Sequence, residues 1–152
     1  MKTKNLNAPD LTQHPPRSAR VRLGGYVILA RCLDKGRATL TGKNGEYHYA
    51  CPLDQHWFNF TGIKPAELKK QLATGKGDGE ILEWIAAHSK TKPQPWQIAV
   101  WSSFHEQRGP SNVGTGEYFI SLLKKLSATR EDIGSWFDLL DLDDYVSFGG
   151  KA

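Results

Sequence analysis

Residues 45–62 read GEYHYACPLDQHWFNFTG, and the second half of this stretch predicts a short amphipathic helix. Pro52 suits the first helical position, because its missing N–H would have no partner there. Cys51 then becomes the N-cap, Asp54 occupies the third helical position, and Gly62 ends the helix. The predicted apolar face consists of Leu53, Trp57 and Phe60. Capping and packing therefore account for the helix and leave the residues at its entrance to be explained.

Helical spacing of apolar residues recurs along most of the chain from about Arg17. A first helix is predicted over residues 26–41, and residues 46–50 allow at most one short extended segment. We predict a mostly α fold, a compact single-domain bundle of six or seven short helices over residues 17–152, after a flexible tail over residues 1–16. The further helices are expected over residues 65–74, after a cap at Asp78, around Trp96, after a cap at Thr115, and after Thr129, which with Asp132 imitates a capping box.

Length and composition are those of one ordinary globular domain. The chain has 152 residues, 39% of them hydrophobic, which is enough for a single core. Val27 to Ala30 is the most apolar run near the start, and it is much too short for a signal peptide or a membrane span. A cytoplasmic location is therefore expected, with Cys32 and Cys51 as free thiols and without membrane contact.

Charge is distributed unevenly along the chain. Residues 1–43 carry a net charge of +7, whereas residues 117–144 carry −4. Such a gradient indicates either an anionic partner for the basic end or two ends that lie near each other in one domain. No nucleic-acid-reading motif accompanies the basic residues, which argues against a nucleic-acid partner. The acids at Asp138, Asp141, Asp143 and Asp144 are interpreted as a charged helix end.

Two adjacent motifs resemble a known family. The stretch LGGYVILARCLDKGRATLTG over residues 23–42, followed at once by residues 45–63, is similar to a bacterial family called domain of unknown function 5069. The resemblance implies a free-standing bacterial domain and brings no activity, cofactor or catalytic residue. Relatives often carry a cysteine where this chain has Gly36, so a role that needs that thiol is not expected here.

Cys51 is the sharpest candidate for chemistry. A thiolate at a helix N-terminus faces unpaired N–H groups and the positive end of the helix dipole, which lower its pKa. Asp54 acts in the opposite direction, and the alternative is that Cys51 is a small buried cap. His48, Cys51, Asp54 and His56 are all ligand types, but their spacing matches no recognised zinc pattern, so no metal site is predicted.

The polar residues of the first helix, Arg31, Asp34, Lys35 and Arg37, have two interpretations. They form either a solvated face, with Asp34 in reach of both arginines, or an inward network that holds an anionic small molecule. The leading hypothesis is a non-catalytic, cofactor-free module that binds a small ligand or partner between the first two helices. The alternative is a small enzyme with Cys51 as nucleophile and His48 or His56 as base. The predicted pocket residues are Arg31, Asp34, Arg37, Glu46, Tyr47, His48, Tyr49, Asp54, His56 and Trp57.

Overall fold

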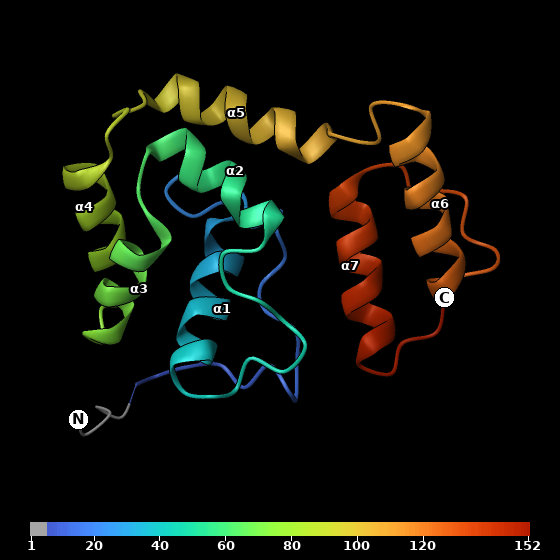
Figure 1. The fold of residues 1–152 in the computed structure, drawn as a ribbon, viewed down its shortest axis with the longest axis horizontal. Coiled ribbons are helices and arrows are strands. Elements are labelled where there is room, and N and C mark those ends of the chain that lie inside the picture. The colour runs from blue at the N-terminus through green and yellow to red at the C-terminus, as the bar shows by residue number, and fades with distance from the viewer. Residues whose placement is uncertain (1–5) are drawn as a thin grey trace.

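The structure is a computed structural model that describes residues 6–152. Within these residues the chain forms seven helices and no strand, so the predicted mostly α fold is confirmed (Figure 1). The residues 46–50 form turns instead of an extended segment. The helices are α1 (Leu29–Leu40), α2 (Pro52–Thr61), α3 (Pro65–Ala73), α4 (Asp78–His88), α5 (Pro95–Gln107), α6 (Val113–Leu126) and α7 (Trp136–Ser147).

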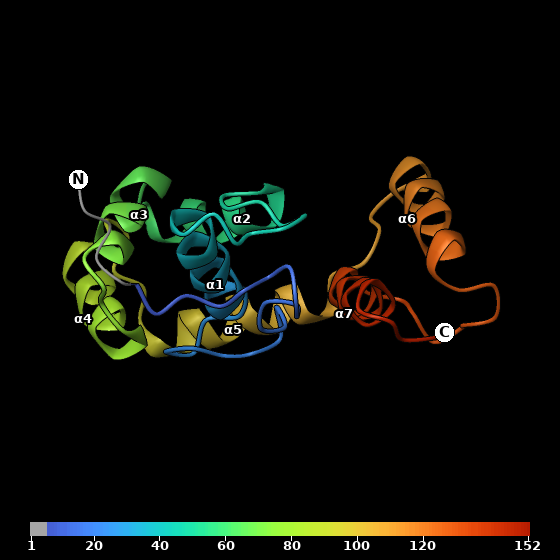
Figure 2. The same ribbon diagram turned by 90° about the horizontal axis from the view of Figure 1, so that it is seen from below.

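Helix α1 is the centre of the molecule. Nine of its twelve residues are buried, including charged ones, because other elements cover it on several sides. Helices α3 and α4 lie on one side of α1, α7 lies on the other, and α5 runs along the edge past α2 (Figures 1 and 2). The core combines α1 with the inward faces of α2, α3 and α4 and with Phe137 of α7. Helix α6 packs on α7 at the far end of the molecule.

The details predicted for α2 are confirmed. Pro52 is its first residue, Cys51 is the N-cap, and Gly62 follows its end with a φ of 74°. This left-handed conformation is readily adopted by glycine because it has no Cβ. Trp57 is fully buried, and the chain folds back after Gly62 so that Ile63 also enters the core.

Part of the predicted tail lies against the domain. The backbone N–H of Leu11 donates to the carbonyl of Lys43 over 2.8 Å, and the Leu11 side chain is buried. Gly45 permits this close approach, since a Cβ there would lie 2.8 Å from the Leu11 carbonyl oxygen. The contact brings residues 11 and 12 beside the turn that leads into α2. Residues 1–5, the start of the predicted tail, lie outside the described residues.

Three predicted helix caps were wrong. Asp78 is the first residue of α4, and Gly77 is the N-cap. Helix α6 is capped by Asn112, and Thr115 is its third residue, bonded back to the cap. Helix α7 starts only at Trp136, with Ser135 and Asp138 as the capping box. The predicted Thr129 box does not form because Ser127 accepts from the N–H groups of the following residues and Arg130 takes the Asp132 carboxylate.

Helix α5 presents its apolar line to solvent. Trp96, Val100 and Phe104 are each more than 60% exposed, whereas Trp101 and His105 face the other helices. None of the helices formed by residues 6–152 has the length and apolar character needed to span a membrane.

Candidate functional site

Acids of α7 bind arginines from the start of the chain. Arg20 pairs with both Asp138 and Asp141, and Arg31 pairs with Asp144. The opposite charges of the two ends of the sequence therefore pair with each other, and the two ends lie near each other, as one of the two interpretations of the charge gradient predicted. Three of the four clustered acids are occupied in this way.

The Arg31–Asp144 pair is buried where α1 faces α7. The guanidinium donates to both carboxylate oxygens over 2.7 and 3.1 Å, and the Tyr47 hydroxyl donates to the same carboxylate over 2.8 Å. Burial opposes the charge of Arg31, but Asp144 outweighs it and raises the pKa of Arg31 above its ordinary value. Burial and the bond to Asp144 also raise the pKa of Tyr47.

The other two predicted pocket residues of α1, Asp34 and Arg37, also make ion pairs. Asp34 accepts from Arg17, at 2.9 Å, and makes no ion pair with Arg31 or Arg37 among residues 6–152. Arg37 instead donates to Asp78 of α4 over 2.7 Å. The spacing along α1 predicted pairs within the helix, but residues from distant segments reach Asp34 and Arg37 first. The ion pairs of Asp34 and Arg37 connect α1 to neighbouring segments, so these two charges are not free for a ligand.

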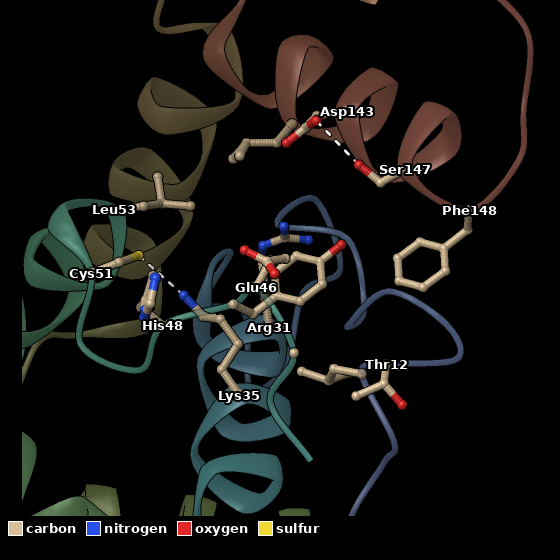
Figure 3. A pocket seen from close by; sticks show the side chains of 14 residues that line it. Thr12, Arg31, Lys35, Glu46, His48, Cys51, Leu53, Asp143, Ser147 and Phe148 are labelled. Carbon is tan, nitrogen blue, oxygen red and sulfur yellow. Dashed lines mark hydrogen bonds between the residues drawn. The ribbon is translucent and has the colours of Figure 1, made fainter. Parts of the chain in front are cut away.

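Lys35 joins α1 to the start of α2. Its ammonium lies 2.8 Å from an Asp54 carboxylate oxygen and 3.1 Å from the Cys51 sulfur (Figure 3). Both charged side chains are almost completely buried, at 3% and 0% exposure. Burial would lower the pKa of Lys35, but Asp54 and Cys51 raise it above the ordinary value, so the ammonium is retained. Cys32, behind this group, is fully buried, and burial raises the pKa of its thiol.

A pocket of about 500 Å³ opens in front of Lys35 and Cys51, and we call it the Lys35 pocket. Figure 3 shows side chains from α1, from the turn before α2 and from α7 around it. Its apolar wall includes Leu53 and Leu140, and the exposed Glu46 and His48 also line it. The remaining lining residues are Leu11, Thr12, Arg31, Lys35, Gly45, Tyr47, Cys51, Asp143, Ser147 and Phe148.

Four of the ten predicted pocket residues, Arg31, Glu46, Tyr47 and His48, line the Lys35 pocket. The other six are Asp34, Arg37, Tyr49, Asp54, His56 and Trp57, and none of them lines it. Trp57 is in the core, and Tyr49 donates its hydroxyl proton to the carbonyl of Pro65. Sequence reasoning missed the residues from α7 and from the segment at Leu11, because no local pattern shows that they approach α1.

His56 does not line the Lys35 pocket and lies against α5. Its ring centroid is 4.9 Å from that of His105, which also contacts Trp101. Burial and the neighbouring Arg108 lower the pKa of His56, and burial lowers the pKa of His105 to about 4. Both imidazoles are therefore neutral near pH 7, and the ring of His56 lies beside that of His105.

Metal-ligating side chains are dispersed. Over residues 6–152, no group of three or more His, Cys, Asp or Glu side chains is arranged to hold a metal ion. Of the four ligand types near residue 51, Cys51 and Asp54 contact Lys35, while His56 faces α5.

Comparisons with known proteins agree with the motif resemblance. The family model described as Domain of unknown function (DUF5069) matches residues 13–146, which is most of the chain. A search of curated proteins found no match. The matched range includes α1 through most of α7 and all the residues that join them in the ion pairs described above. The chain therefore belongs to the DUF5069 family.

Proposed function

We propose that the protein binds a small, largely apolar molecule in the Lys35 pocket. A volume of about 500 Å³ is within the usual range for small-molecule sites, which combine apolar walls with a few polar groups. The observation that carries the proposal is the buried Lys35 ammonium in the pocket wall. An ammonium has three donors, and within the described residues Lys35 makes one hydrogen bond, to Cys51, besides its ion pair with Asp54, so a donor is left for an acceptor atom of a ligand.

The charges around the pocket restrict the ligand further. The guanidinium of Arg31 is occupied by Asp144, so it does not supply the positive charge that the sequence predicted for an anion. Within the described residues neither Glu46 nor Asp143 makes an ion pair, and Asp143 accepts a hydrogen bond from the Ser147 hydroxyl. These carboxylates favour a donor or a positive charge on the ligand. The occupant of best fit is a neutral or zwitterionic molecule with an acceptor at the Lys35 end.

Screening of neutral and zwitterionic fragments by heteronuclear NMR tests this proposal. Bound fragments are expected to shift the amide signals of residues 45–53 and of the end of α7. Leu140→Trp fills the pocket and should abolish binding, whereas Ile120→Trp places the same ring on an exposed site of α6 and should leave binding unchanged. Fragments that bind equally well to the Leu140→Trp variant would overturn the proposal.

A second candidate, thiol chemistry at Cys51, is favoured by the 3.1 Å contact between Lys35 Nζ and Cys51 Sγ. A neighbouring ammonium and the start of a helix both stabilise a thiolate. The Asp54 carboxylate shares the same ammonium and opposes this effect. His48 lines the pocket beside Cys51, although no hydrogen bond joins them among the described residues.

Alkylation with iodoacetamide separates the two candidates. In the catalytic case, Cys51 of the native protein reacts at neutral pH at least tenfold faster than in the urea-unfolded chain, and Lys35→Met removes the difference. The buried Cys32 provides an internal reference, because it should react only after unfolding. A native rate no higher than the unfolded rate rules out an activated nucleophile and leaves the binding proposal untouched.

A further inference from the structure

Three basic side chains meet where α2 packs on α5, outside the Lys35 pocket. His56 comes from α2, His105 from the last turn of α5, and Arg108 from the residue that follows this helix. The two imidazole rings are 4.9 Å apart, and Arg108 is close enough to lower the pKa of both. None of the three lines the Lys35 pocket, so this cluster is not part of the proposed function above.

The cluster has no carboxylate partner. Arg108 makes no ion pair among residues 6–152, and burial is the only cause of its pKa shift, which is downward. The nearest acid in sequence, Glu106, binds Arg22 over 3.2 Å. Asp138, near the start of α7, pairs with Arg20. Neighbouring acids are therefore committed to other arginines, and the positive charge of Arg108 is not compensated.

Polar atoms inside the cluster also lack hydrogen-bond partners. Nδ1 of His105 and Nε of Arg108 are buried and make no hydrogen bond within the described part of the chain. His105 is only 5% exposed, whereas His56 and Arg108 are half-buried. Buried polar atoms of native proteins usually have a partner, and a cationic group prefers an anionic one. His56 and Arg108 are therefore the members of the cluster that are partly exposed to solvent.

We propose that His56, His105 and Arg108 form a binding site for a small oxyanion, such as a phosphate or carboxylate group. The guanidinium offers a planar pair of donors that matches such an anion. Each imidazole is neutral in the free protein and has one N–H donor, and it gains a second N–H donor when it takes up a proton. Binding therefore shifts the two histidines toward their protonated forms, and affinity increases as the pH falls toward 5.

Histidine NMR titrations with and without inorganic phosphate test the site directly. The chain has five histidines, and His14 and His88 are exposed references outside the cluster. Saturating phosphate is expected to raise the pKa of both His56 and His105 by about one unit, the size of a nearby opposite charge. The same titration with acetate distinguishes a site for carboxylates from one restricted to phosphate. Shifts no larger than those of His14 and His88 with either anion overturn the proposal.

Two arginine variants assign the effect. Arg108→Gln should weaken phosphate binding at least tenfold, whereas Arg130→Gln, which removes an exposed arginine paired with Asp132, should not change it. Arg108→Lys keeps the charge without the planar donor pair and should give an intermediate affinity. Equal binding by the Arg108→Gln and Arg130→Gln variants would show that the anion binds elsewhere. If Arg108→Gln does not fold, the titration of the unmodified protein decides alone.

Discussion

Removal of the Lys35 ammonium provides the sharpest test of the buried network. Lys35 and Asp54 are 2.8 Å apart, with side-chain exposures of 3% and 0%. Lys35→Met keeps the side-chain length but leaves the Asp54 carboxylate without its positive partner. Loss of one member of a buried pair costs about 3–5 kcal/mol. Because the free energy of unfolding of such proteins is about 5–15 kcal/mol, the variant should lose a large part of its stability.

The double variant Lys35→Met with Asp54→Leu separates the buried charge from general damage to packing. It removes both charges and should recover most of the loss, because buried pairs are commonly replaceable by apolar residues. Urea unfolding followed by circular dichroism measures Lys35→Met, Asp54→Leu and the double variant. An exposed pair, Arg130 and Asp132, is the control, and Arg130→Met should change the unfolding free energy far less. A loss below about 1 kcal/mol for Lys35→Met, or a double variant that loses the sum of both single losses, refutes this reasoning.

Three further predictions concern a cap, a hydrogen bond and a histidine. Ser135→Ala should destabilise the protein by about 1 kcal/mol because it removes the cap of α7, whereas Thr129→Ala should have little effect; equal losses in urea unfolding would contradict the observed cap. Tyr47→Phe removes a donor to the buried Asp144 and should cost about 1–2 kcal/mol in the same assay; an unchanged midpoint would place that hydroxyl in solvent. The His105 pKa of about 4 lies below the ordinary 6.5, so between these values the unfolded chain binds a proton that the folded chain does not. The free energy of unfolding should therefore fall as the pH drops from 6.5 to 4, by at most about 3 kcal/mol. His105→Gln should flatten this pH dependence, which urea unfolding across that window measures.

Helix ends with strong local chemistry were predictable from neighbouring residues. Pro52 and Gly62 bound α2 as expected, because a proline without N–H and a glycine with positive φ act within a single turn. Weak caps were not predictable in this way. Thr129 and Ser135 both precede an acid at the third position, and only the contacts of Ser127 and Arg130 decide between them.

The candidate site was only partly predictable. Glu46, His48 and Cys51 were singled out because packing and capping of α2 do not explain them, and all three line the pocket. Leu140 of α7 and Phe148, the residue after α7, also line the pocket and come from far along the chain. No periodicity near residue 50 carries information about them, so their approach had to be seen in the fold.

The sequence by itself determined the helical class, the bounds of α2 and the family motifs around residues 23–63. Only the tertiary structure decided which carboxylate each basic residue of α1 meets. Arg31 binds Asp144, 113 residues away, and Lys35 binds Asp54, although their spacing on α1 suggested a solvated face or pairs within the helix. The physical reason is that helix propensity depends on residues within one turn, whereas the partner of a buried charge is whichever group the fold brings within about 3 Å.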